Sequence, residues 1–311
     1  MIKALLLVQP QKQQLEKLTK AFPQIIFSTD PSIAATTEIV LGWRAELKQV
    51  FLRNPNLKWV QAQSAGVDYL PLREFADKQI LLTNASGLHS RYIAETVTSY
   101  ILLENRGLRE IIQRPSEWFE PDVLESREQT ALIFGTGKIG REIGRYCRFL
   151  GMQVWGVNRH GMDDSLGDVF DRVITMAAYQ QLSKQLKINF LISVLPGTKA
   201  TAGFFDQNML QQCRPGYTFI NVGRGSAVKE KDLLNLLKNE YIRSAYLDVF
   251  EHEPLPKNSI LWHHPRVFVT PHISGLLPHF RQELFPLFSD NLSSYLTNQP
   301  LRNLVDLGAG Y

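Results

Sequence analysis

The chain has 311 residues, of which 44% are hydrophobic and 21% are charged, a composition that is typical of a folded globular protein and excludes disorder as its main state. At roughly 150 residues per domain, this length predicts two domains. The net charge of +4 comes from 34 basic and 30 acidic side chains without a long run of Lys or Arg, so we expect no nucleic-acid partner.

The first hundred residues alternate between short apolar runs and amphipathic stretches such as QKQQLEKLTKAF and ELKQVFLR. Five of the apolar runs predict strands, at residues 4–8, 25–27, 38–41, 57–60 and 80–83. This alternation is typical of a parallel sheet with helices on its faces. A long helix is predicted next, over residues 90–107, with Ser90 as its N-cap and Gly107 at its end.

A second alternating series begins at Thr130. It predicts strands at residues 131–134, 152–157, 190–195, 218–222, 245–250 and 267–270, and helices over 139–150, 229–239 and 278–296. We therefore expect an α/β protein with two doubly wound parallel-sheet domains. Residues 1–93 form the first part of one domain, residues 94–275 form the other, and residues 276–311 carry a helix that returns to the first.

The N-terminal run MIKALLLVQP is too short for a signal peptide or a membrane span, so we expect no membrane contact. Cys147 and Cys213 do not form a CxxC pair, and two reduced, structural thiols are the expected state. These features favour a cytoplasmic protein.

Residues Gly135, Gly137 and Gly140 lie in the order G-x-G-x-x-G between an apolar run and a predicted helix. The first glycine permits a tight turn, the second leaves room for a pyrophosphate, and the third lets helix and strand approach closely. The helix N-terminus, with Lys138 and Ile139, would offer N–H groups to the phosphates. This pattern predicts a dinucleotide site; the alternative is a glycine-rich turn that only packs.

The strand after this turn ends at Asn158 and Arg159, where an NAD site would place an Asp or Glu against the ribose hydroxyls. A carboxylate there would repel a 2′-phosphate, whereas a guanidinium can bind it through charge-assisted hydrogen bonds. The sequence therefore favours NADP(H), with NAD(H) possible. In the alternative, Arg159 is a solvated surface charge.

Three later segments place polar residues after apolar runs: FINVGRGS with Arg224, LDVFEHEPLP with Asp248 and Glu253, and VFVTPHISG with His272. Ligands of open parallel sheets bind outside the carboxyl ends of the strands, so these side chains could converge. Arg can hold a carboxylate and polarise a carbonyl. His can protonate the developing alkoxide, and a neighbouring Glu would favour the imidazolium. This set suits the reduction of a 2-oxo acid.

The motifs GTGKIG, VLPGTKATAG, NVGRGSAV, LDVFEHEPLP and TPHISG, in this order, closely resemble those of the D-isomer-specific 2-hydroxyacid dehydrogenases, as does the loop QSAGVDYL. The resemblance spans the chain and implies a Rossmann cofactor domain inserted in a flavodoxin-like substrate domain, and a homodimer formed through the cofactor domain. Within the family the chain looks most similar to the glyoxylate/hydroxypyruvate reductases.

The resemblance also implies roles for individual residues. Arg224 would bind substrate and take part in catalysis, Glu253 would be the partner of the acid, and His272 would be the proton donor. Asp248 would help to hold the nicotinamide carboxamide, and the backbone amides of Ala65, Gly66 and Val67 would receive the substrate carboxylate. Further cofactor contacts are expected at Leu195, Pro196, Val222, Gly223, Ser274 and Gly275.

Substrate size is least explicit in the sequence. Trp43 and Arg44 follow an apolar run and are candidates for substrate selection; in the alternative, Trp43 packs beneath a helix and Arg44 is solvated. His89 is a further candidate for the cleft. No His or Cys cluster has the spacing of a metal site, so we expect no metal.

The expected function is NAD(P)-dependent reduction of a small 2-oxo acid to a D-2-hydroxy acid. Two alternatives stay open. One is a D-lactate-type or other dehydrogenase of the same family, and the other is a non-catalytic, dinucleotide-sensing scaffold similar to the family's corepressors.

Overall fold

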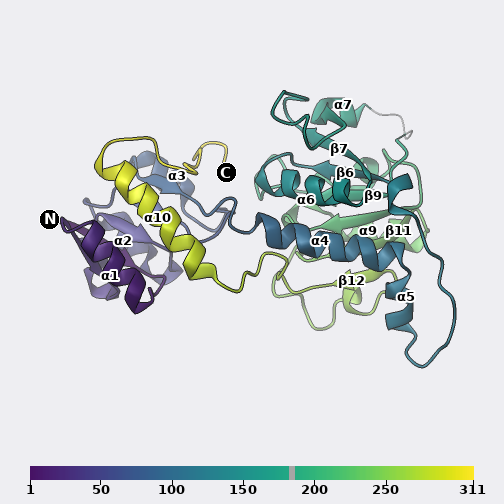
Figure 1. Ribbon diagram of the computed structural model, residues 1–311, viewed down its shortest axis with the longest axis horizontal. Coiled ribbons are helices and arrows are strands. Elements are labelled where there is room, and N and C mark those ends of the chain that lie inside the picture. The colour runs from purple at the N-terminus through teal and green to yellow at the C-terminus, as the bar shows by residue number, and fades with distance from the viewer. Residues whose placement is uncertain (182–185) are drawn as a thin grey trace. The chain divides into compact units, whose positions relative to one another are not determined.

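The computed structural model describes residues 1–181 and 186–311 (Figure 1). The chain divides into two compact units, one of Met1–Leu88 with Leu277–Tyr311 and the other of His89–Leu276. The sequence analysis placed the two boundaries between these units after residue 93 and after residue 275. Among the described residues, no helix combines the length and the apolar character that a membrane crossing requires.

The first unit is built on a five-stranded sheet in which every pairing is parallel. Its strands are β1 (Ile2–Leu6), β2 (Ile25–Ser28), β3 (Ile39–Leu41), β4 (Trp59–Gln61) and β5 (Leu81–Thr83). Their spatial order is β2-β1-β3-β4-β5, which is the flavodoxin-like order of doubly wound sheets. Each strand overlaps a run that the sequence predicts as a strand.

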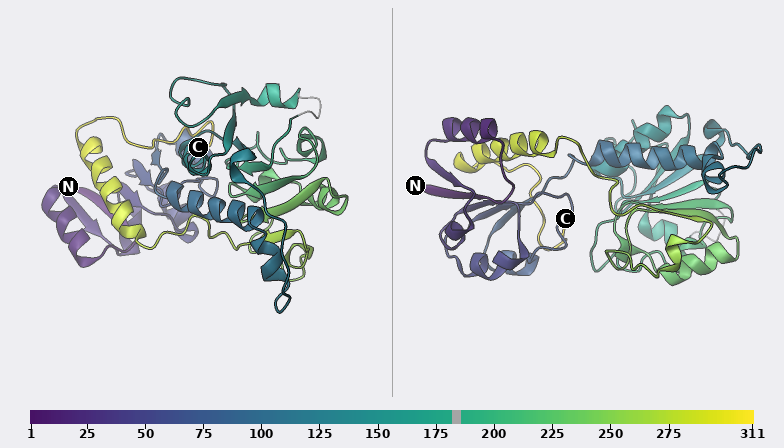
Figure 2. Two further views of the ribbon diagram at one scale, coloured as in Figure 1. Left: turned by 45° about the vertical axis from the view of Figure 1, so that its right-hand side comes forward. Right: turned by 90° about the horizontal axis from the view of Figure 1, so that it is seen from below.

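Helices cover both faces of this sheet. They are α1 (Lys12–Ala21), α2 (Lys48–Arg53), α3 (Leu72–Asp77) and α10 (Phe280–Leu296). Leu18 of α1 and Phe288 of α10 share one apolar cluster with Leu6 of β1, whereas Phe51 of α2 and Leu5 share the other. Successive β1 side chains thus point to opposite faces, as the period of two residues requires. Figure 2 (right) shows α1 and α10 together on one face of the sheet.

The second unit is built on a seven-stranded parallel sheet among the described residues. Its strands are β6 (Thr130–Phe134), β7 (Gln153–Asn158), β8 (Arg172–Thr175), β9 (Phe190–Ser193), β10 (Tyr217–Asn221), β11 (Ile242–Leu247) and β12 (Val267–Val269). The order β12-β11-β10-β9-β6-β7-β8 is the Rossmann order, in which the first strand lies between the two halves. The edge strand β8 is the one that the sequence analysis did not predict.

The helices of the second unit also form two layers. They are α4 (Ser90–Asn105), α5 (Leu108–Gln113), α6 (Lys138–Phe149), α7 (Met176–Gln180), α8 (Gln207–Leu210) and α9 (Glu230–Lys238). Val97 of α4 and Ile143 of α6 belong to one apolar cluster, and Leu236 of α9 belongs to the other. In Figure 2 (right), α4 and α9 lie on opposite faces of the sheet.

The ends of α4 correct one local prediction. The helix begins at Ser90, its N-cap is His89, and no side chain caps it. Gly107, with φ 63°, follows the last helical turn in the left-handed conformation that glycine adopts at low cost. Two doubly wound parallel sheets confirm the predicted α/β fold class, and they bring the candidate residues of the second unit to one sheet edge.

Candidate active site

The phosphate turn joins β6 to α6. Gly135 has φ 103°, a left-handed conformation that favours glycine. A Cβ on Gly140 would lie 1.8 Å from the carbonyl oxygen of Gly135, so only glycine permits this approach of helix to turn. A Cβ on Gly137 would meet nothing within 4 Å, which leaves open space beside the N-terminus of the twelve-residue α6 that begins at Lys138. This space and these N–H groups fit a pyrophosphate.

The ribose end of the site lies where β7 ends. Asn158 Nδ2 donates to Thr136 Oγ1 over 2.9 Å and to the Gly161 carbonyl over 3.0 Å, while its Oδ1 accepts the backbone N–H groups of His160 and Gly161. The amide therefore fixes the turn that carries the exposed Arg159. No carboxylate follows β7 within this turn, as the sequence analysis noted.

The ends of β9 and β10 form the next part of the edge. A Cβ on Gly223 would lie 2.6 Å from the Leu195 carbonyl oxygen, so these two segments are in backbone contact. Thr201 Oγ1 donates to the Pro196 carbonyl over 2.5 Å and holds that loop. Val222 is buried. The residues expected to contact the cofactor after β9 and β10 thus lie together.

The structure brings His272 and Glu253 into direct contact. His272 Nδ1 lies 2.7 Å from Glu253 Oε2, and Glu253 Oε1 accepts the Phe250 N–H over 3.0 Å. Because a carboxylate only accepts, Nδ1 carries the proton of this hydrogen bond, and Nε2 is the ring nitrogen left for chemistry. The His272 side chain is about half exposed, at 49%, so it can exchange protons with solvent.

Arg224 follows β10 by three residues and is half-buried. Its Nη1 donates to the Gly223 carbonyl over 2.9 Å, and its own carbonyl accepts from Asn221 Nδ2 over 3.1 Å. The next residue, Gly225, packs so tightly that a Cβ there would lie 1.9 Å from the carbonyl carbon of Phe250. The loop of Arg224 therefore packs directly on the loop that positions Glu253.

Asp248 follows β11 directly and is fully buried. Its Oδ1 accepts from Thr270 Oγ1 over 2.6 Å and from the Ile273 N–H over 2.9 Å, and its Oδ2 accepts the Ser274 N–H over 3.0 Å. A carboxylate has about four acceptor positions, and three of them bind the turn that contains His272. The contact of Asp248 with a nicotinamide carboxamide, which the resemblance implies, stays a prediction.

His272 itself has φ 53°, in the left-handed region. A non-glycine residue held there costs of order 1–3 kcal/mol and persists only where its surroundings fix it. The His272 N–H donates to the Asp248 carbonyl over 2.8 Å, so the same residue holds the backbone on both sides of the strained position. Gly275, two residues beyond Ile273, accepts from His89 Nδ1 over 2.8 Å through its carbonyl. His89, a further candidate from the sequence, therefore lies beside the end of the turn that contains His272.

The remaining candidates lie in the first unit, after β3 and β4. The carbonyl of Ala65 accepts from Asn84 Nδ2 over 2.8 Å, that of Gly66 accepts from Ser64 Oγ over 2.8 Å, and Val67 is buried. These bonds fix the loop whose amides, according to the resemblance, would receive the substrate carboxylate.

Trp43 and Arg44 lie where β3 has ended. Trp43 is 9% exposed and packs against Phe51 and Phe75, with ring centroids 5.1 Å and 5.4 Å away. These contacts are those of the packing alternative, in which Trp43 supports the fold. Arg44 is half-buried.

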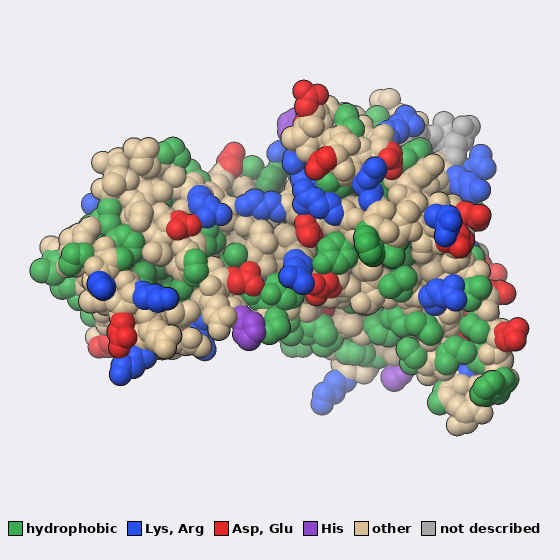
Figure 3. Space-filling model, viewed as in Figure 1, with side chains coloured by type: hydrophobic (Ala, Val, Ile, Leu, Met, Phe, Trp, Pro, Cys, Tyr) green, Lys and Arg blue, Asp and Glu red, His purple; other side chains and the backbone are tan. Residues whose placement is uncertain are grey.

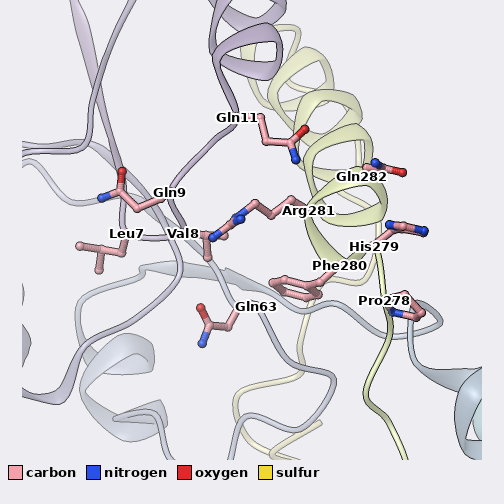
Figure 4. Close-up of a pocket in the computed structure, with 10 residues that line it drawn as sticks. All are labelled: Leu7, Val8, Gln9, Gln11, Gln63, Pro278, His279, Phe280, Arg281 and Gln282. Atoms are coloured by element: carbon pink, nitrogen blue, oxygen red, sulfur yellow. The ribbon is translucent and has the colours of Figure 1, made fainter.

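The first unit also contains an open pocket of about 450 Å³ that the sequence analysis did not predict (Figure 4). Leu7 and Val8 after β1, Gln63 after β4, and Phe280 and Arg281 at the start of α10 contribute to its lining. Ala65, Gly66 and Val67 do not line it. A signal for it existed in the sequence, since segments that follow strands of a parallel sheet gather at one edge. In the described ranges, no group of three His, Cys, Asp or Glu side chains could hold a metal ion.

The second unit combines a dinucleotide turn with an Arg, a Glu and a His beyond the carboxyl ends of neighbouring parallel strands. This combination is typical of nicotinamide-dependent oxidoreductases. Residues 101–274 match the family described as D-isomer specific 2-hydroxyacid dehydrogenase, NAD binding domain. The chain belongs to this family.

Individual relatives agree with this assignment. A glyoxylate/hydroxypyruvate reductase A of Citrobacter koseri is 31% identical over 275 residues, which cover 84% of this chain and 85% of the relative. Among solved structures, an NADPH-dependent glyoxylate/hydroxypyruvate reductase of Sinorhizobium meliloti, in complex with NADP and sulfate, is 27% identical and superposes with a TM-score of 0.82 over the whole of both chains. A D-isomer specific 2-hydroxyacid dehydrogenase family protein of Aeromonas salmonicida is 32% identical, with a TM-score of 0.83 over 98% of this chain and 99% of the other.

Proposed function

We propose that this protein reduces a small 2-oxo acid, of the glyoxylate or hydroxypyruvate type, to the D-2-hydroxy acid, with NADPH as the preferred cofactor and His272 as the proton donor. The observation that carries the proposal is the 2.7 Å contact between His272 Nδ1 and Glu253 Oε2. A histidine oriented by a carboxylate through one ring nitrogen is built to transfer a proton through the other.

The reduction adds a hydride to the carbonyl carbon and a proton to the carbonyl oxygen. NADPH, when bound, supplies the hydride. The guanidinium of Arg224 binds the substrate carboxylate and polarises the carbonyl. His272 gives its Nε2 proton to the carbonyl oxygen and is left neutral, with Nδ1–H still bound to Glu253. Because its ring is half exposed, solvent then restores the proton.

Two features favour NADPH. Asn158 cannot repel a 2′-phosphate as a carboxylate would, and its hydrogen bonds to the backbone of residues 160 and 161 shape the turn on which Arg159 stands. An exposed guanidinium on this turn can bind a phosphate through charge-assisted hydrogen bonds. The relatives from Sinorhizobium meliloti and Citrobacter koseri, by their names, use NADPH and reduce glyoxylate or hydroxypyruvate, respectively.

The test is the decay of NADPH absorbance with glyoxylate, hydroxypyruvate, pyruvate and longer 2-oxo acids. We expect the highest kcat/KM for glyoxylate or hydroxypyruvate. His272→Gln should lower kcat by about 10²- to 10⁴-fold, since one positioned acid is lost, and should leave the Kd for NADPH within about twofold. A preference for pyruvate would favour the D-lactate-type alternative. Bound NADPH without turnover of any 2-oxo acid would favour the dinucleotide-sensing scaffold.

We further propose that the protein is a cytoplasmic homodimer. Apolar side chains are exposed on α5 and the segment after it, among them Ile112 at 62% and Trp118 at 103%, and Figure 3 shows apolar surface over this region at the lower right. Exposed apolar patches of this kind mark protein interfaces, and a second copy is the partner that the family suggests. The cytoplasm suits two buried, unpaired cysteines, Cys147 and Cys213. Light scattering should give twice the monomer mass, and Trp118→Asp with Ile112→Asp should halve it.

A further inference from the structure

A chain of hydroxyl groups reaches from α4 to the turn that contains His272. Tyr100 of α4 lies with its hydroxyl 2.7 Å from Thr270 Oγ1, and Thr270 Oγ1 donates to Asp248 Oδ1 over 2.6 Å. Asp248 in turn accepts the N–H groups of Ile273 and Ser274, and its carbonyl accepts the N–H of His272. Three consecutive amides around His272 therefore depend on one buried residue.

The direction of this chain follows from its chemistry. The carboxylate of Asp248 only accepts, so the single Thr270 hydroxyl proton points to Asp248. The Thr270 oxygen must then accept from Tyr100, whose hydroxyl is the donor. Burial raises the pKa of Tyr100 to about 12, so the phenol keeps its proton at any working pH. Each group of the chain can adopt only one orientation.

We infer that Thr270 and Tyr100 are positioning residues that act through Asp248 to hold the strained His272 in the geometry required for proton transfer. The inference rests on the proposed function of His272 and assigns Asp248 chiefly to this turn. It follows from two observations on residues that are hydrogen-bonded to each other. His272 has a left-handed φ of 53°, and Asp248 is completely buried against residues 270–274. A strained residue needs surroundings that fix it, and this chain supplies them.

Tyr246 offers a matched control for Tyr100. Tyr246 of β11 stacks on Tyr100 with a centroid distance of 5.1 Å, and its hydroxyl donates to Glu104 Oε2 over 2.9 Å instead of to the turn. Tyr100→Phe and Tyr246→Phe thus each remove one phenol hydroxyl from a pair of stacked rings. Only the hydroxyl of Tyr100 is hydrogen-bonded to Thr270. Thr270→Val removes the hydroxyl at nearly constant volume, and Thr270→Ser restores it.

The kinetic test compares these four variants. Thr270→Val should lower kcat by about 10- to 100-fold, since misplacement of a reacting group by about 1 Å costs up to about 10². Tyr100→Phe should lower it by a few fold, and KM for NADPH should change less than about twofold in both. The solvent deuterium isotope effect on kcat should rise in Thr270→Val and Tyr100→Phe, because proton transfer becomes more rate-limiting. A smaller folded fraction would lower kcat without raising this isotope effect. Thr270→Ser and Tyr246→Phe should stay near the native values.

The second measurement does not depend on turnover. Hydrogen exchange of the backbone amides of residues 272–274 should be about tenfold faster in Thr270→Val and unchanged in Tyr246→Phe. If the native protein reduces no 2-oxo acid, the proposed function fails, while faster exchange in Thr270→Val still supports the positioning chain. Native exchange rates and a native kcat in Thr270→Val and Tyr100→Phe would overturn the inference. A raised KM for NADPH with a native kcat in these variants would also overturn the inference, since this result would assign Asp248 to the cofactor.

Discussion

Gly225→Ala tests whether the contact between the loops of Arg224 and Glu253 sets the catalytic geometry. A Cβ at residue 225 would lie 1.9 Å from both the carbonyl carbon and the carbonyl oxygen of Phe250. Non-bonded heavy atoms prefer separations of about 3.5–4.0 Å, so the two backbones must move apart by more than about 1 Å. Arg224 precedes the substitution, and Phe250 donates its N–H to Glu253, so both catalytic groups move with the backbone.

A misplacement of about 1 Å can cost about 100-fold in rate, which corresponds to about 2.7 kcal/mol of transition-state stabilisation. Overpacking should also lower the free energy of unfolding by about 1–3 kcal/mol, a loss that leaves most of the protein folded at 25 °C. We therefore expect kcat/KM for the 2-oxo acid to fall by about two orders of magnitude in a folded protein.

The assay combines kcat/KM with circular dichroism and urea unfolding. Gly167→Ala is the matched control, because the nearest atom to its added Cβ would be the Asp164 carbonyl oxygen at 3.9 Å, an ordinary contact. Its kinetics should remain native. A folded Gly225→Ala protein with native kcat/KM would refute the reasoning, since the two loops could then separate without consequence for the reaction.

Three further predictions concern other parts of the structure. Arg224→Lys should lower kcat/KM by about 100-fold or more and raise KM for the 2-oxo acid, because Lys lacks the planar fork that binds a carboxylate in two places; native kinetics would show that a point charge suffices. Asn158→Asp with Arg159→Ala should shift the ratio of kcat/KM values from NADPH toward NADH, and a native enzyme that already prefers NADH would contradict the proposal. Burial raises the pKa of the Cys147 thiol from its usual value near 9 to about 12, so its contribution to stability is full below about pH 9 and is lost as pH rises toward 12. Urea unfolding should therefore show a loss of about 1 kcal/mol between pH 8 and pH 10 that is absent in Cys147→Ala; an equal loss in both proteins would contradict this cause.

The fold could be predicted largely from sequence because alternating apolar runs and amphipathic stretches specify βα units locally. The phosphate turn was equally predictable, since Gly135 and Gly140 meet steric demands that only glycine satisfies, and Gly137 leaves open space beside the helix N-terminus. Strand β8 escaped prediction because an edge strand buries only part of its residues, which makes its apolar run short. The N-cap of α4 was misplaced by one residue because the buried Ser90 side chain makes no capping hydrogen bond.

The candidate site was only partly predictable. The resemblance implied a pairing of Glu253 with His272, and the crevice rule placed both at one sheet edge, but neither could give their 2.7 Å contact. Tyr100 could not be recognised at all, because on a helix its pattern is that of an ordinary core residue, and its partner Thr270 lies 170 positions away in the chain. Trp43, in contrast, was recognised as a candidate, but the sequence allowed it either to select the substrate or to pack in the core. The structure shows it packed against the rings of Phe51 and Phe75.

The most direct test of the central claim is to follow the hydride itself. The native protein would be incubated with glyoxylate or hydroxypyruvate and NADPH that carries deuterium at the transferred position of the nicotinamide. We predict one deuterium on the carbon that bears the new hydroxyl group of the 2-hydroxy acid, detected by NMR, and a D-configured product from hydroxypyruvate. A product without deuterium, or no product while NADPH remains bound, would contradict the claim that this protein is a 2-oxo acid reductase.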